Sequence, residues 1–261
     1  MTVFVGTSGW QYDSWRGKFY PEKLPKSRWL EHYATRFRTV EVNNTFYRLP
    51  GPDTFAEWAR RTPDDFVIVP KLSRYLSHIK RLRDPEEPVH RFLEHSAPLG
   101  AKRGPLLLQL PPDFQADVRR LDAALTQFPR DVRVAVEFRH RSWYVDDVRA
   151  VLEHRGAALV LADRGSRPMG PLWRTADWAY IRLHHGRGLP PPCYGRGALR
   201  AWAQRLRELW GSEADAYVFF NNDGRACAPR DAARFERLVA RDQPAPKMAA
   251  TSWGAATANC A

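Results

Sequence analysis

Short apolar runs alternate with amphipathic helical patterns along almost the whole chain. The stretch 164–177 lacks such a pattern and predicts a loop. The runs are rich in Val, Ile, Leu and aromatic residues and are short enough to be buried strands. They occupy residues 3–6, 39–43, 66–71, 106–110, 132–138, 157–163, 178–184 and 216–222. Strands that alternate with helices are typical of parallel strands joined by crossover helices.

Eight such units in 261 residues predict one closed (β/α)8 barrel of the TIM type. The barrel domain is expected over residues 1–250, with a C-terminal tail at 251–261 and an irregular or missing helix after the sixth strand. An open doubly wound sheet is the alternative. Such a sheet normally has a glycine-rich phosphate-binding turn after its first strand, and GTSGWQYDSWRG at 6–17 does not match that turn.

Cysteine usage and charge limit the compartment and the partners. Cys193, Cys227 and Cys260 are odd in number and lack CxxC spacing. They predict a reducing, cytoplasmic compartment, with neither a disulfide framework nor a structural zinc site. No membrane span or signal peptide is expected. The net charge of +12 suits an acidic partner such as nucleic acid, but the arginines are spread through the predicted helices, which favours a solvated basic surface. The oligomeric state stays open.

The run 132–144, VRVAVEFRHRSWY, begins as a buried strand and ends in charge. Alternate residues of a barrel strand face either the interior or the outer helices. Val134, Val136 and Phe138 form the set expected to face the helices. Glu137 and Arg139 belong to the other set and are therefore expected inside the barrel, near the carboxyl end of the strand, where barrel enzymes carry their chemistry.

Other predicted strands repeat this pattern of apolar core followed by a polar end. The polar residues expected at the same mouth are Glu41, Asn43, Lys71, Gln109, Asp163, Arg182 and His184, together with Asn222 from the sequence FNND at 220–223. Polar groups that gather at one end of so many strands predict a functional mouth.

Several long stretches carry a resemblance to a known family. They run in order from about residue 4 to about residue 240 and read GTSGWQYDSWRGKFYP, TVEVNNTFYRLP, WARRTPDDF, LLLQLPPDF, AVEFRHRSW, YIRLHH and FNNDGRACAPRDA. The chain resembles the YecE-like family, also called domain of unknown function 72. The resemblance implies a TIM-type barrel and carries no settled reaction. The chain departs from the family pattern at Ser77-His78, where Thr-His is usual, and at Asp231, where Asn is usual.

Four residues are candidates for catalysis: Glu41, Glu137, Asp163 and His184. The two glutamates can divide acid and base roles, as in glycoside hydrolysis. Cationic neighbours would keep them ionised, and the competing interpretation is that they pair with arginines and hold the mouth rigid. The four residues can also supply ligands to a divalent metal, but no ligand spacing supports this, so no metal ligand is assigned and the cofactor is unknown.

A second set of residues suggests anion binding. Lys71, Arg139 and Arg182 suit a phosphate or carboxylate, and Asn43, Gln109 and Asn222 can orient the rest of a polar ligand. Trp10 and Tyr12 lie in the loop after the first strand, where they either stack on a ligand or pack beneath the loop. The leading hypothesis is a hydrolase-like enzyme for a phosphate-bearing or otherwise anionic small molecule. A nucleic-acid-binding protein without catalysis and a carbohydrate-active enzyme using Glu41 and Glu137 are the alternatives.

Overall fold

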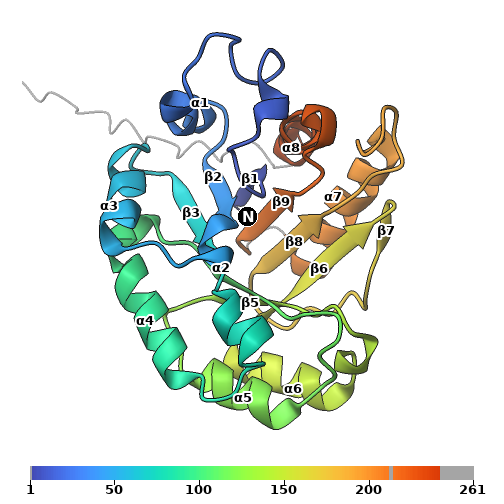
Figure 1. Ribbon diagram of the computed structural model, residues 1–261. Helices are drawn as coiled ribbons and strands as arrows, with labels where there is room; N and C mark the ends of the chain where they lie inside the picture. Colours follow the sequence, from blue (N-terminus) through green and yellow to red (C-terminus); the bar gives the residue numbers. More distant parts are fainter. Residues whose placement is uncertain (1, 212–213, 242–261) are drawn as a thin grey trace, which may run out of the picture.

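The computed structural model describes residues 2–211 and 214–241, and its centre is a parallel sheet surrounded by helices (Figure 1). All eight predicted strands are confirmed. They are β1 (Val3–Thr7), β2 (Thr39–Val42), β3 (Val67–Pro70), β4 (Leu106–Gln109), β5 (Val134–Glu137), β6 (Ala158–Arg164), β8 (Ala179–Leu183) and β9 (Ala216–Phe220). The additional short strand β7 (Arg167–Pro168) pairs antiparallel with the end of β6.

Helices follow most of the strands, and the longer helices lie on the outer side of the sheet (Figure 1). The α-helices are α1 (Trp29–Ala34), α2 (Asn44–Tyr47), α3 (Pro52–Arg60), α4 (Glu86–Ser96), α5 (Val118–Thr126), α6 (Asp146–Arg155), α7 (Arg196–Trp210) and α8 (Cys227–Arg241). Shorter helical turns are η1 (Asp13–Trp15), η2 (Lys26–Arg28), the π-helix η3 (Tyr75–Ile79), η4 (Ala97–Lys102), η5 (Arg141–Trp143) and η6 (Gly224–Ala226). No helix separates β6 from β8 in the described segment 165–178, so the missing helix is confirmed.

The strands follow one another around the sheet in chain order. One sheet has the order β1-β9-β8-β6-β5-β4, with β7 paired to β6, and a second contains β2 and β3. Isolated parallel bridges, Ser8–Glu41, Ile68–Arg103 and Lys71–Leu107, lie between these sheets. This sequential order differs from that of a doubly wound sheet, which reverses at a switch point. The ladders show a curled parallel sheet in the form of a half-barrel, whereas the predicted closed (β/α)8 barrel would need ladders all the way round.

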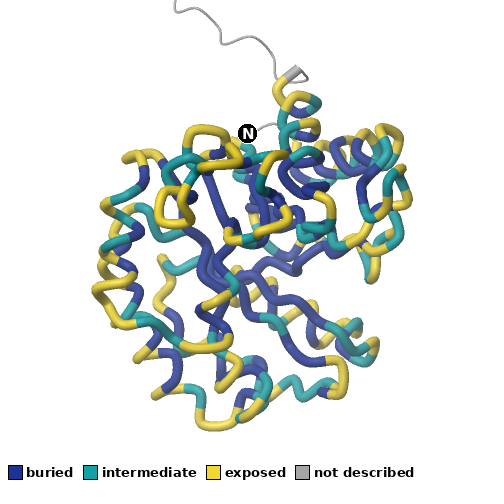
Figure 2. Tube along the Cα trace, turned by 45° about the horizontal axis from the view of Figure 1, so that its top comes forward, coloured by how far each residue is buried: buried dark blue, intermediate teal, exposed yellow. Residues whose placement is uncertain are grey.

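The strands are buried at the centre of the molecule (Figure 2), and the two faces of the curled sheet contribute to separate apolar clusters. The smaller cluster fills the concave inside and consists of Val69, Leu107, Ala135, Ala158, Val160, Trp178, Tyr180, Tyr217 and Phe219. The larger cluster joins the outer face to the helices and contains Val136, Ile181 and Leu206. Alternation along each strand therefore directs one set of side chains inward, and apolar packing fills the inside below the strand ends.

Cys193 and Cys227 form a disulfide that joins the loop after β8 to the first residue of α8. The expectation of no disulfide is therefore wrong for this pair. The loop folds back on itself through the bond from Gly188 N to the Cys193 carbonyl oxygen, 2.7 Å long, and this brings Cys193 against α8. The Cα atoms are 4.9 Å apart, a separation that suits a disulfide. Sequence spacing did not show this contact.

The sequence predicts a C-terminal tail and no membrane span. The predicted tail at 251–261, with Cys260, lies outside the described residues. Among residues 2–211 and 214–241, no helix has both the length and the apolar character needed to cross a membrane.

Candidate functional site

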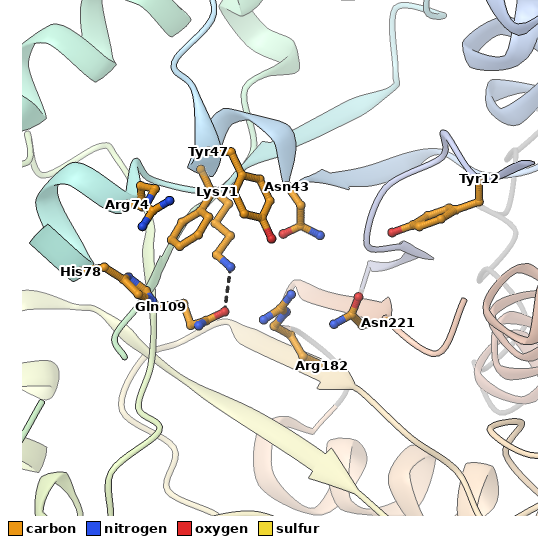
Figure 3. A pocket seen from close by; sticks show the side chains of 10 residues that line it. Tyr12, Asn43, Tyr47, Lys71, Arg74, His78, Gln109, Arg182 and Asn221 are labelled. Carbon is orange, nitrogen blue, oxygen red and sulfur yellow. Dashed lines mark hydrogen bonds between the residues drawn. The ribbon is translucent and has the colours of Figure 1, made fainter. Parts of the chain in front are cut away.

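A cavity of about 530 Å³ opens where the strands end (Figure 3). Its lining comes from the carboxyl ends of β3, β4 and β8 and from the segments that follow β1, β2, β3 and β9. The lining residues are Tyr12, Asn43, Phe46, Tyr47, Lys71, Arg74, His78, Gln109, Arg182 and Asn221. Three of them are Lys or Arg and none is Asp or Glu, so the lining is cationic.

Arg182 forms the floor of the cavity and separates the two predicted carboxylates. Its Nη2 donates to Glu41 Oε1 at 2.7 Å, and its Nη1 pairs with Glu137 Oε2. The Tyr180 hydroxyl donates to the other oxygen of Glu41 at 2.8 Å. Glu41 and Glu137 are fully buried, and Arg182 is 2% exposed. These contacts confirm the predicted inward direction of β2, β5 and β8 at their carboxyl ends.

Glu137 has further partners on its second oxygen. Arg139 Nη2 lies 2.6 Å from Glu137 Oε1, and His184 Nε2 lies 3.0 Å from the same atom. Burial by itself raises the pKa of Glu137, but Arg182, His184 and Arg139 together outweigh burial and hold this pKa well below its usual value. Glu137 is therefore an ionised carboxylate with a full set of donors, as expected.

His184 connects this ion pair to the cavity wall. The Asn221 side-chain nitrogen lies 3.0 Å from His184 Nδ1, on the opposite side of the ring from Glu137. Burial lowers the pKa of His184 in spite of the adjacent carboxylate, so the ring is neutral near pH 7. One neutral tautomer satisfies both contacts: Nε2–H donates to Glu137, and Nδ1 accepts from Asn221.

Lys71 is the buried amine of the cavity. Its Nζ donates to Gln109 Oε1 at 2.7 Å and lies 4.0 Å from the centre of the Phe46 ring. Within the part of the chain that the structure describes, no carboxylate lies within ion-pair distance of this nitrogen. Burial and the nearby Arg182 charge lower the pKa of Lys71 to about 8.

The rim of the cavity combines aromatic, basic and imidazole groups. The Tyr12 hydroxyl donates to the Ser8 carbonyl oxygen at 2.6 Å, which directs this ring along the cavity wall. Arg74 and His78 belong to the segment after β3 (Figure 3). Burial, together with the charges of Lys71 and Arg74, lowers the pKa of His78 to about 4, so this imidazole is neutral near pH 7.

Three predicted site residues lie away from the cavity. Asp163 accepts from the Tyr194 hydroxyl at 2.6 Å and from Trp202 Nε1 at 2.7 Å. Since Trp202 belongs to α7, this carboxylate faces the outer helices, and the predicted inward face of β6 is wrong. Ala158 and Val160 occupy the inside instead. Asp163 therefore does not lie at the mouth, where it was predicted to be catalytic.

The other two displaced residues are Asn222 and Trp10. Asn222 donates to the Pro192 carbonyl oxygen and to Asp231 Oδ2, at 3.1 and 2.9 Å, beneath the loop that carries the disulfide. Trp10 is 5% exposed and packs edge-to-face on Trp58 of α3, with ring centres 5.8 Å apart. Packing beneath the loop is therefore the correct interpretation for Trp10, and Asn222 does not line the cavity.

The remaining predicted residues do converge. Asn43, Lys71, Gln109, Arg182 and Tyr12 line the cavity, and Glu41, Glu137, Arg139 and His184 form the network connected to its floor. Sequence reasoning missed four lining residues that follow strands: Phe46, Tyr47, Arg74 and His78. It also chose Asn222 rather than Asn221. In the structure the inward positions of Tyr217 and Phe219 continue at Asn221, but both faces of β9 are apolar, so the sequence alone did not indicate this face.

The position of Arg182 disfavours two of the candidate chemistries. A guanidinium fills the space between the carboxylates, where a shared metal ion would have to sit. Among residues 2–211 and 214–241, no group of three His, Cys, Asp or Glu side chains could hold a metal ion. Glu137 is also a poor general acid because its pKa is lowered, which argues against the glycosidase pair.

Comparison with known proteins identifies the family. A family model described as "Protein of unknown function DUF72" matches residues 4–254, nearly the whole chain. The chain belongs to the DUF72 family. This confirms the resemblance drawn from the sequence motifs. The chain is 27% identical over 249 residues to the UPF0759 protein YecE of Escherichia coli K12, a match that covers 87% of this chain and 89% of YecE.

Solved structures support the same assignment and the fold. The crystal structure of a DUF72 family protein from Thermotoga maritima is similar with a TM-score of 0.81 at 30% identity, covering 92% of this chain and 100% of that chain. A D-psicose 3-epimerase structure is similar with a TM-score of 0.50 at 12% identity, covering 83% of this chain and 95% of that chain. At this identity the second likeness shows a TIM-barrel-like fold alone.

Proposed function

We propose that the DUF72 cavity binds a small phosphate-bearing molecule and that the protein is an enzyme that acts on this molecule. One observation carries the proposal: the cavity lining contains Lys71, Arg74 and Arg182 and no carboxylate. We also propose that the strands act as a (β/α)8 barrel, which gathers these groups at the carboxyl ends of the strands, as in barrel enzymes.

The balance of charge around the cavity supports an anionic ligand. Glu41 and Glu137 are matched by Arg182 and Arg139, since each glutamate contacts at least one of these guanidinium groups. The charges of Lys71 and Arg74 are then left without carboxylate partners in the described part of the chain. Two uncompensated cations in a partly closed cavity attract a phosphate group, which accepts charge-assisted hydrogen bonds from both.

The cavity lining also contains uncharged groups that can contact the part of the ligand without charge. Asn43, Gln109 and Asn221 present amide side chains to the cavity and Tyr47 presents a ring (Figure 3). Phe46 adds a second ring to the lining. Asn43 Oδ1 is buried without a hydrogen-bond partner, so it can accept from a ligand hydroxyl. A small polar molecule with one phosphate group fits this combination of cations, amides and rings.

Hydrolysis, the reaction expected from the sequence, stays a prediction. Glu41, Glu137 and His184 lie in the network below the lining, so we propose that they position Arg182 and Asn221 rather than contact substrate. Among the lining groups, Lys71 has a pKa near the physiological range and is therefore the best candidate for proton exchange.

Calorimetric titration with matched pairs tests phosphate recognition. We expect glycerol 3-phosphate and ribose 5-phosphate to bind at least about tenfold more tightly than glycerol and ribose, because only the phosphate reaches both cations. Arg74→Gln should weaken phosphate binding about tenfold without lowering the unfolding midpoint, because Arg74 is exposed at the rim. Arg119→Gln, at an exposed position on α5, is the control. Equal affinity within each pair would overturn the proposal.

A further inference from the structure

Lys71 is held rigidly at the carboxyl end of β3. Its backbone N donates to the Val42 carbonyl oxygen at 3.1 Å, and its carbonyl oxygen accepts from Thr45 Oγ1 at 2.7 Å. The side chain is 7% exposed, and Nζ points into the cavity, where Gln109 Oε1 accepts one of its protons (Figure 3). The amine is therefore fixed in direction, unlike a lysine on the surface.

Burial and the nearby Arg182 charge favour the uncharged form of this amine. Its two direct contacts supply no negative charge to offset them, because Gln109 is a neutral acceptor and Phe46 presents a ring to Nζ. The charged groups that act on Lys71 are Arg182, Glu41, Glu137 and Arg139, and both carboxylates are engaged by arginines. With a pKa of about 8, roughly a tenth of the Lys71 amines carry a free lone pair at pH 7, far more than for an ordinary exposed lysine.

We propose that Lys71 forms an imine with the carbonyl group of a phosphate-bearing aldehyde or ketone. This inference rests on the proposed phosphate binding and names the reactive group and the substrate class. A desolvated lysine beside another cation is the arrangement that activates amines for this chemistry. Arg74, whose charge has no carboxylate partner among the described residues, would hold the phosphate at the rim, and the carbonyl carbon could then reach Nζ inside the same cavity.

The reaction balances without an oxidant or a reductant. The lone pair of the neutral amine attacks the carbonyl carbon and forms the C–N bond, and the carbonyl oxygen becomes the hydroxyl of a carbinolamine. Loss of that hydroxyl and of the remaining N–H proton as one water molecule gives the imine. The imine, once protonated, withdraws electrons from the adjacent carbon and makes a proton or a carbon–carbon bond there easier to break.

Reductive trapping tests the imine in the intact protein. The protein is incubated with glyceraldehyde 3-phosphate and cyanoborohydride near pH 7, and peptide mass spectrometry locates the resulting secondary amines. The chain has only seven lysines, so each site can be followed separately. We expect Lys71 to be labelled at least about tenfold faster than the exposed Lys18, because a larger share of Lys71 is uncharged. Excess glycerol 3-phosphate should protect Lys71 and leave Lys18 unprotected.

Variants distinguish a reactive lysine from a merely accessible one. Lys71→Arg keeps the positive charge and should still bind glycerol 3-phosphate but form no adduct at position 71, whereas Lys18→Met should leave labelling of Lys71 unchanged. Labelling of Lys71 no faster than that of Lys18, with glycerol 3-phosphate still bound, would overturn the imine and leave the proposed function standing. Absence of glycerol 3-phosphate binding would overturn both. Fast labelling that glycerol 3-phosphate does not slow would overturn the phosphate-bearing substrate class.

Discussion

Arg182 determines what its neighbouring carboxylates can do. Its guanidinium contacts both Glu41 and Glu137, and the Tyr180 hydroxyl completes the partners of Glu41. Breaking such a buried network by removing one charge leaves another charge without compensation, which costs more than the network contributes as a whole. The floor of the cavity is therefore best understood as a rigid support for Arg182, His184 and the groups they touch.

Glu137→Gln keeps the shape of the side chain and removes its charge. We expect the free energy of unfolding to fall by about 3–5 kcal/mol, because Arg182 and Arg139 lose a buried counter-charge. Glycerol 3-phosphate should bind at least as tightly as before, since the surroundings of the cavity become more positive. Chemical denaturation and calorimetry measure the two quantities.

A surface substitution provides the control for Glu137. Glu153→Gln removes a carboxylate that pairs with Arg149 on the exposed side of α6, and it should change the free energy of unfolding by less than about 1 kcal/mol. A Glu137→Gln protein as stable as the wild type, with phosphate binding lost, would show that Glu137 acts on the ligand and does not mainly support the floor.

The pKa of Lys71 gives phosphate binding a pH dependence of definite sign. The ammonium form attracts the ligand, and the free protein loses this proton as the pH rises through about 8. Affinity should therefore be full below pH 8 and should fall by up to about tenfold per pH unit above it. Titrations between about pH 7 and pH 9.5 avoid the second ionisation of the phosphate group. Lys71→Arg should show a nearly flat profile, and a flat wild-type profile would contradict the role of this amine.

At the scale of elements, the sequence predicted the positions of all eight strands. It did not predict which face of β6 and of β9 points into the curled sheet. In β5, polar residues occupy only the inner set, so alternation assigned Glu137 correctly. In β6, both faces are apolar, with Val160 inside and Leu161 outside, and alternation cannot tell them apart. The partners of Asp163 are Tyr194 and Trp202, which lie 31 and 39 residues away, and no local pattern reveals such a pairing.

The same ambiguity affected the last strand and the segments between strands. In β9, Tyr217 and Phe219 point inward while Val218 and Phe220 point outward, so the choice between the two following asparagines had no polar guide. Arg74 and His78 lie beyond the end of β3, in a segment whose course depends on tertiary packing, and strand periodicity does not extend to them.

Asp163→Ala tests the corrected position of this residue. The substitution leaves the Tyr194 hydroxyl and Trp202 Nε1 without an acceptor between β6 and α7, which should lower the free energy of unfolding by about 2–4 kcal/mol. Affinity for glycerol 3-phosphate should stay within about twofold, because Asp163 lies outside the cavity lining. Asn221→Ala should instead lower the affinity for glycerol 3-phosphate and change the free energy of unfolding little, since Asn221 lines the cavity. If the Asp163→Ala protein loses glycerol 3-phosphate binding at a temperature where the protein is folded, Asp163 contributes to the ligand site after all.

At the scale of the whole molecule, the sequential strand order explains why one cavity collects these residues. Neighbours in the sequence are neighbours in the sheet, so all the carboxyl ends of the parallel strands point the same way. The isolated bridges from the end of β1 to β2 and from the β3 region to the β4 region bring both sheets to the same mouth. Length and alternation of elements sufficed to predict this arrangement, because it depends on topology and not on any particular side chain.

With a net charge of +12, the protein can bind an anionic partner either in the cavity or on its basic surface. Binding of a single-stranded oligonucleotide to a diffuse basic surface weakens steeply with salt, because counterions are released from the nucleic acid. We expect such binding, followed by fluorescence anisotropy between about 50 and 200 mM salt, to be steeply salt-dependent. It should be the same for the wild type and for Lys71→Arg and Arg74→Gln, and saturating glycerol 3-phosphate should not displace the oligonucleotide. Displacement by glycerol 3-phosphate would place the nucleic acid in the cavity. In that case the cationic lining would serve a polymeric ligand, and the nucleic-acid alternative would replace the small-molecule enzyme.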